Sequence, residues 1–272
     1  MVHCIWTSLK ARLQRITQGE KDSFNWVFLP GGPGMGSESL SGLTSLLRLP
    51  GSMWHLDLPG DGSNTTENDS YYFSHWSSAL ADVVASLDNV ILVAHSTGGM
   101  YALATPILQS WLKGLVLMDS APNSSWQHLF SKYVQQNPID ELNNLHEQYL
   151  ISPNNELLKK MVLASIPYLF SEAGLTRDLS FLENLPYNHQ TCDWSAQNFD
   201  NIYQAQWIPE FIPTLIFSGE NDHITPLQLF HDATQFRRNN ILMKTISQAG
   251  HFPWIDNPEA VCLAFSEYCT ML

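Results

Sequence analysis

Residues 90–99, VILVAHSTGG, are the most informative stretch of this 272-residue chain. The four apolar residues at its start are typical of a short strand that is buried on both faces. The strand runs directly into Ser96, and small residues then begin a helix. This order indicates a tight strand–serine–helix turn of the form G-x-S-x-G, in which the flanking backbones nearly touch and only small side chains fit. Gly98 satisfies the second small position, whereas Ala94 replaces the first glycine and adds one methyl group.

Short apolar runs recur along the chain, and each ends at a turn signal. They do not alternate strictly between apolar and polar residues, so they favour strands buried on both faces of a parallel sheet. Segments with helical periodicity lie between them, at 75–87, 97–108, 227–236 and 260–268. This alternation predicts an α/β fold with a doubly wound, mostly parallel sheet. The apolar runs are 26–29, 53–56, 90–93, 115–118, 214–217 and 242–246.

The alternation lapses between about Asn123 and Trp207. An insertion of this size between two core strands indicates a helical cap over the carboxyl edge of the sheet, where open α/β sheets bind ligands. We therefore predict a core formed by residues 1–122 and 208–272, and a cap at 123–207. Residues 1–25 are expected to add one or two strands. Within the cap, the periodicity predicts helices at 129–135, 139–149, 155–170 and 195–207.

The composition limits the classes of partner. Apolar residues make up 44% of the chain and charged residues 14%, as in folded proteins with a sizeable core. The 26 acids outnumber the 13 bases, and the formal net charge is −13. This charge repels phosphate backbones and anionic membranes, so we expect a small-molecule substrate and no nucleic-acid partner. No apolar run approaches the roughly 18 to 20 residues that a membrane span needs.

The cysteines and the first residues predict a cytoplasmic protein. No cysteine belongs to a CxxC pair or a metal-like cluster, so the four are interpreted as free thiols in a reducing compartment. The N-terminus lacks a charged segment followed by an apolar one, and no signal peptide is predicted. No cofactor or metal is predicted, and the oligomeric state stays open. The cysteines are Cys4, Cys192, Cys262 and Cys269.

Four further segments, together with residues 90–99, resemble the α/β-hydrolase superfamily over almost the whole chain. LPGGPG resembles the family's HGGPG loop, with Pro30 where histidine is common. DLPGDGS resembles its D-x-P-G-x-G-x-S turn. FSGENDHITP resembles the segment that carries the catalytic acid, and GHFPWIDNPE resembles the histidine loop. The resemblance implies the α/β-hydrolase fold. These segments lie, in the same order, at 29–34, 57–63, 217–226 and 250–259.

The resemblance also implies the roles of the site residues. A serine hydroxyl is a weak nucleophile near neutral pH and needs a base such as histidine, which in turn needs a carboxylate to orient it. The resemblance assigns these roles to Ser96, His251 and Asp222, in the family's chain order. It further implies that the backbone N–H groups of Gly32 and Thr97 form an oxyanion hole.

Other polar residues near these positions have alternative interpretations. Asp119 directly follows an apolar run, and some relatives place the acid there, so it remains an alternative to Asp222. His95 and His223 flank predicted catalytic positions and are expected to pack or to form hydrogen bonds. Two acids of the 57–63 segment are expected to shape its turn, namely Asp57 and Asp61.

A Ser-His-Asp set implies acyl transfer to water through a covalent acyl-serine. The leading prediction is an esterase that cleaves a carboxylic ester of a small, largely apolar substrate, in class EC 3.1.1. An aspartate in place of Ser96 would indicate epoxide or haloalkane chemistry, so the serine argues against both.

Three alternative functions remain open. The loop at 30–34 is similar to that of proline iminopeptidases, but Pro30 replaces their histidine and Thr97 replaces the tryptophan that follows their serine. Hydrolysis of a carbon–carbon bond uses the same triad. A catalytically weak ligand receptor would keep the fold without multiple turnovers. The sequence leaves the natural substrate and the motion of the cap open.

Overall fold

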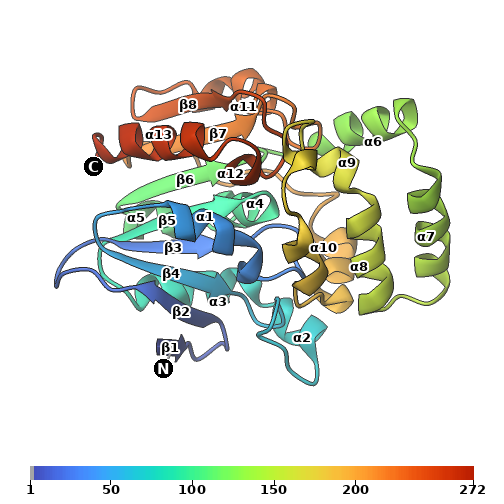
Figure 1. The fold of residues 1–272 in the computed structure, drawn as a ribbon. Helices are drawn as coiled ribbons and strands as arrows, with labels where there is room; N and C mark the ends of the chain where they lie inside the picture. Colours follow the sequence, from blue (N-terminus) through green and yellow to red (C-terminus); the bar gives the residue numbers. More distant parts are fainter. Residues whose placement is uncertain (1–2) are drawn as a thin grey trace.

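The computed structural model describes residues 3–272. Within those residues, eight strands form one sheet in the order β1-β2-β4-β3-β5-β6-β7-β8 (Figure 1). All neighbouring strands from β4 to β8 run parallel, whereas β1 and β2 are antiparallel additions at one edge. The strands are β1 (His3–Trp6), β2 (Arg12–Thr17), β3 (Asn25–Leu29), β4 (Ser52–Asp57), β5 (Val90–His95), β6 (Gly114–Met118), β7 (Thr214–Gly219) and β8 (Ile241–Ile246). The prediction of a mostly parallel α/β sheet with extra N-terminal strands is confirmed.

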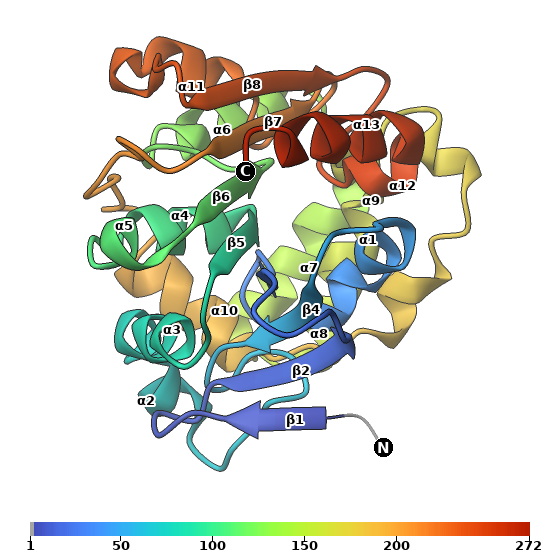
Figure 2. The same cartoon turned by 90° about the vertical axis from the view of Figure 1, so that its left-hand side faces the viewer.

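Helices cover both faces of the sheet, as Figure 2 shows. Alternate residues of one strand point to opposite faces, so Val27 of β3 belongs to one buried apolar cluster and Phe28 to the other. The Val27 face is covered by α3 (Trp76–Ala85), α4 (Thr97–Leu103), α5 (Leu108–Trp111) and α11 (Gln228–Asp232). The Phe28 face is covered by α1 (Ser41–Leu46), α12 (Pro253–Asp256) and α13 (Pro258–Cys269). A short helix, α2 (Asp69–Phe73), lies near the β1 edge (Figure 1).

Residues 123–207, which we call the cap segment, carry the helices between β6 and β7 and gather beyond one end of the sheet (Figure 1). The two ends of the segment meet in an antiparallel bridge between Asn123 and Gln204. The Ser124 N–H also donates to the Tyr203 carbonyl at 2.9 Å. The segment therefore leaves and rejoins the sheet at one place. Its helices are α6 (Trp126–Gln136), α7 (Asp140–Ile151), α8 (Asn155–Ala164), α9 (Ile166–Leu169) and α10 (His189–Asn198).

Two details of the predicted cap helices are wrong. The helix expected at 195–207 begins earlier, at His189, because the Asn188 side chain accepts the Gln190 N–H and caps the start of α10, and it ends at Asn198. The residues that follow run back to the core, where the Trp207 indole N–H donates to the Ala102 carbonyl at 2.8 Å. The helix expected at 155–170 is broken at Ser165 into α8 and α9. Proline near the start of α9 prevents a continuous helix.

The helices are short compared with the thickness of a membrane. Within residues 3–272, none combines the length and the apolar character that crossing a bilayer requires.

Candidate active site

Ser96 lies in a strained turn between β5 and α4. Its backbone φ is 51° and its ψ is −124°, a conformation that a non-glycine residue adopts only when its surroundings enforce it. The Ser96 N–H donates to the Met118 carbonyl at 2.9 Å, and the Ser120 hydroxyl donates to the Ser96 carbonyl at 2.8 Å. A Cβ on Gly98 would lie 2.4 Å from the Pro30 carbonyl oxygen, which explains the need for glycine. This packing fixes the serine at the carboxyl end of the sheet.

Ser96, His251 and Asp222 form one hydrogen-bonded chain. They follow β5, β8 and β7 respectively. His251 Nε2 lies 2.9 Å from Ser96 Oγ, and His251 Nδ1 lies 3.1 Å from Asp222 Oδ2. All three residues are buried, with exposed fractions of 8% for the serine, 5% for the histidine and 2% for the aspartate. The structure thus brings together the three residues that the sequence singled out, and their catalytic roles remain a prediction.

The loop around Asp222 stabilises its negative charge. The Ile224 and Thr225 N–H groups donate to Oδ1 at 2.9 and 3.2 Å, and the Thr225 hydroxyl donates to Oδ2 at 2.9 Å. Burial alone would raise the pKa of Asp222, but His251 and these hydrogen bonds outweigh it and lower the pKa below its ordinary value. Thr225 is not among the site residues predicted from the sequence. The spacing Asp-x-x-Thr, in which an aspartate accepts from backbone N–H groups two and three residues later, was the signal for its role.

Two contacts hold the histidine loop in place. The His251 N–H donates to the carbonyl of Leu169 in the cap segment at 2.8 Å. Behind the loop, the His95 ring contacts the His251 carbonyl through Nε2 at 2.9 Å. Burial, and next the nearby His251, lower the pKa of His95 to about 3, so the ring is neutral and its Nε2–H donates to that carbonyl. His95 therefore forms a hydrogen bond beside the site, as expected from its sequence position.

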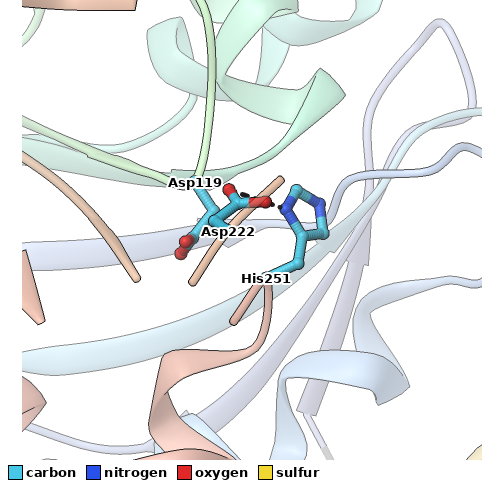
Figure 3. A group of neighbouring side chains, drawn as sticks. All are labelled: Asp119, Asp222 and His251. Carbon is cyan, nitrogen blue, oxygen red and sulfur yellow. Dashed lines mark hydrogen bonds and ion pairs between the residues drawn. The ribbon is translucent and has the colours of Figure 1, made fainter. Parts of the chain in front are cut away.

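Asp119 lies beside Asp222 but is not bonded to His251. One carboxyl oxygen of each aspartate and one nitrogen of His251 lie within 4.8 Å of one another. Figure 3 shows the Asp222 carboxyl group pointing at the histidine ring, with Asp119 next to it. Such a trio also has the atoms of a metal site, yet both ring nitrogens of His251 already contact Ser96 and Asp222. The geometry thus favours Asp222 over Asp119 as the partner of the histidine.

The N–H groups predicted to bind an oxyanion donate no hydrogen bond to the described part of the protein. Among residues 3–272, no acceptor receives a hydrogen bond from the backbone N–H of Gly32 or of Thr97. Thr97 is the first residue of α4, where an N–H has no acceptor within its own helix. Gly32 has a φ of 52°, and a Cβ on the preceding Gly31 would lie 2.4 Å from the Ser96 Cβ. The glycine loop therefore packs directly against the serine.

Buried acids hold the glycine loop. Asp61 Oδ1 accepts the Gly34 N–H at 2.7 Å, and Asp57 Oδ1 accepts the Ser37 N–H at 2.7 Å. Asp57 is also paired with Arg12 at 2.6 Å. Burial, and next the Asp57 carboxylate, raise the pKa of Asp61 to about 7. Both acids support the turn, as the sequence predicted.

Two pockets lie beside the site. An apolar pocket of about 710 Å³ lies among the cap helices, and none of its lining residues is an acid, a lysine or an arginine. It adjoins the site through Leu169 and Ile224, whose backbones bond to His251 and Asp222. Its apolar lining includes Trp126, Phe130, Val134, Met161 and Val162. A polar pocket of about 490 Å³ is lined by Tyr133, Glu172, Asn221 and His223 among others. Ser96 lines neither of these two pockets, and it is largely buried.

Known proteins with related sequences include hydrolases. A putative esterase/lipase of Mycoplasma genitalium is 25% identical over 83% of this chain and 82% of its own. A pimeloyl-[acyl-carrier protein] methyl ester esterase of Xylella fastidiosa is 22% identical over 85% of this chain and 89% of its own.

Solved structures share the fold. A proline iminopeptidase-related protein of Thermus thermophilus is 20% identical and aligns over 100% of this chain and 98% of its own, with a TM-score of 0.76. An esterase of Exiguobacterium antarcticum is 18% identical and aligns over 99% of this chain and 100% of its own, with a TM-score of 0.73. The family model described as "Alpha/beta hydrolase family" matches residues 26–264. The chain therefore belongs to the alpha/beta hydrolase family.

Proposed function

We propose that this protein is a serine esterase that cleaves carboxylic esters of small, largely apolar molecules. The observation that carries the proposal is the buried hydrogen-bonded chain from Ser96 through His251 to Asp222. It supplies a nucleophile, a base within hydrogen-bond reach and an acid that orients the base, which is the arrangement that acyl transfer requires. The names of the related esterases support the same reaction.

In the proposed mechanism, Ser96 Oγ attacks the ester carbonyl while His251 Nε2 takes the hydroxyl proton. Asp222 stabilises the resulting imidazolium and keeps the ring oriented. The N–H groups of Gly32 and Thr97 receive the oxyanion, and each such donor typically contributes about 10²- to 10³-fold in rate. The tetrahedral intermediate collapses and expels the alcohol, which takes the proton from His251. Water, deprotonated by the same histidine, then cleaves the acyl-serine and releases the acid.

The apolar pocket supports an ester with an apolar chain. A mostly apolar lining without acids binds hydrocarbon well and stabilises no ammonium group, because a buried charge needs a partner of opposite sign. This composition favours esters over the N-terminal amines that a proline iminopeptidase binds. The same triad would also serve a carbon–carbon bond hydrolase, so the reaction has to be tested on more than one bond type.

A substrate panel tests the proposal. Purified protein is assayed with p-nitrophenyl acetate, butyrate and octanoate, with prolyl-p-nitroanilide and with a 1,3-diketone, each beside the Ser96→Ala variant. The proposal predicts multiple turnovers of the esters that disappear in the variant, with slower or no release from the amide. Faster cleavage of the prolyl amide or the diketone would replace the ester assignment. Binding of these compounds without turnover would favour a receptor.

A further inference from the structure

A second carboxyl group, that of Asp119, lies behind the proposed triad and has no role in the mechanism above. Asp119 follows β6, is 0% exposed and has a φ of 44°. Its Oδ1 accepts the Gly219 N–H at 2.9 Å. Its Oδ2 is buried and has no hydrogen-bond partner among the residues that the structure describes. Because an unpaired buried oxygen is costly, this atom calls for an explanation.

The surroundings of Asp119 oppose a second negative charge. Asp222 and Asp256 are the acids whose charges act on it, and no lysine or arginine within residues 3–272 forms an ion pair with Asp119 or Asp222. Two buried carboxyl groups this close cannot both ionise readily. Burial, and next the Asp222 charge, raise the pKa of Asp119 well above its ordinary value.

The hydrogen bonds decide which of the two carries the charge. Asp222 accepts two backbone N–H groups and the Thr225 hydroxyl, and it also faces His251. Asp119 accepts a single backbone N–H. Donors stabilise a carboxylate, so Asp222, which accepts more hydrogen bonds, is the favoured site for the negative charge.

We propose that Asp119 is a neutral carboxylic acid whose Oδ2–H donates to the Asp222 carboxylate, and that it is a positioning residue for the triad. The inference rests on the proposed roles of Ser96, His251 and Asp222. The Asp119 proton stays on Asp119 throughout the reaction, and its hydrogen bond fixes the Asp222 carboxylate against rotation. It also keeps a single negative charge behind His251. A second charge there would favour the imidazolium in the resting enzyme and stop His251 from accepting the serine proton.

The decisive variant is Asp119→Asn, because an asparagine amide has the shape and the donor of a protonated aspartic acid but cannot ionise. The readout is the rate at which a fluorophosphonate labels Ser96, measured from about pH 5 to about pH 9, the range in which a histidine base titrates. This readout needs no knowledge of the natural substrate. We expect the labelling rate of Asp119→Asn to stay within about threefold of the parent, since the hydrogen bond is kept. The midpoint of the acid limb of its pH profile should not move.

A downward shift of this midpoint is the result that would contradict the proposal. If Asp119 were ionised, the asparagine would remove a unit charge beside His251, and the midpoint would move down by about one pH unit or more. That shift would overturn the inference. The matched control is Asp222→Asn, for which labelling should slow by about 10³-fold or more.

A second variant, Asp119→Leu, separates positioning from a merely structural role. Leucine keeps the branched shape of the side chain but neither accepts from Gly219 nor donates to Asp222. If thermal melting shows that this variant is folded, we expect the labelling rate and the kcat for p-nitrophenyl butyrate to fall by about 10-fold or more, with KM unchanged. A lower melting temperature with an unchanged kcat would show that Asp119 is only structural. If Asp119→Leu does not fold, the pH profile of Asp119→Asn decides alone. Absence of labelling in the parent would instead contradict the proposed function.

Discussion

The carboxyl edge of the sheet and the cap segment differ in how deeply their residues are buried. Every residue of β5, β6 and β7, which lead to Ser96, Asp119 and Asp222, is buried. In the cap segment, α6 and α7 contain no buried residue at all. The proposed catalytic groups therefore lie on the rigid part of the molecule, whereas the apolar pocket lies among its loosely packed helices.

This difference separates the proposed chemistry from the proposed selectivity. Hydrogen bonds within the core fix the distances of the Ser96–His251–Asp222 chain, and only the Leu169 carbonyl joins it from the cap segment. Changes in the core should thus affect all substrates alike. Changes in the cap segment should alter which substrates are used and how quickly they enter.

The largest effect is expected from His251→Gln in the core. Glutamine cannot take the serine proton, so kcat for p-nitrophenyl butyrate should fall by about 10⁴-fold or more while the fold is retained. His231→Gln is the matched control, because His231 is exposed and lies outside the site. Steady-state kinetics and thermal melting of both variants provide the measurement. A fall in kcat of less than tenfold in His251→Gln would contradict the assignment of His251 as the base.

An intermediate effect is expected from Val162→Trp in the cap segment. The larger ring should fill part of the apolar pocket, so kcat/KM for the octanoate ester should fall by about tenfold relative to the acetate ester. Lys160→Trp places the same ring on an exposed position of α8 and should leave the ratio unchanged. Parallel assays of the two esters give the ratio directly. Equal losses for both esters would show that the pocket does not hold the ester chain.

The smallest effect is expected where the two regions touch. Tyr133 of α6 stacks on His223 of the acid loop, with ring centroids 3.9 Å apart and planes inclined by 14°. Such a pair is worth about 0.5–1.5 kcal/mol. Because Ser96 is only 8% exposed, Tyr133→Ala should let the cap segment open more often and speed fluorophosphonate labelling by about 2- to 10-fold.

Tyr133→Phe is the control for that variant, since it keeps the ring and removes only the hydroxyl. Its labelling rate should match the parent. If Tyr133→Ala is labelled no faster than Tyr133→Phe, then this stack does not limit access to Ser96.

The same difference between the regions explains what the sequence could predict. The core follows local rules: a buried strand must be apolar, and the turn at Ser96 tolerates only small neighbours such as Gly98. These rules predicted the sheet and its parallel strands, whereas the resemblance indicated that Ser96, His251 and Asp222 form one site. The choice of Asp222 over Asp119 came from the resemblance, because both acids follow core strands and only the fold shows which one meets the histidine.

Local sequence patterns predict the structure of the cap segment less well. Its helices bury little, so their periodicity is faint, and the expected helix at 195–207 was misplaced because the Asn188 cap was overlooked. The role of Thr225 was also missed, since a threonine before a proline indicates a helix start as readily as a partner for Asp222. The apolar pocket depends on how α6, α7 and α8 pack together, which no local pattern encodes.

The central claim is that Ser96 is an activated nucleophile, and intact-mass analysis after fluorophosphonate treatment tests it most directly. The parent protein and the Ser96→Ala variant are treated side by side, after melting curves have shown that both are folded. The account predicts one adduct on the parent and none on the variant. An unlabelled, folded parent, or a variant that is labelled equally well, would contradict it.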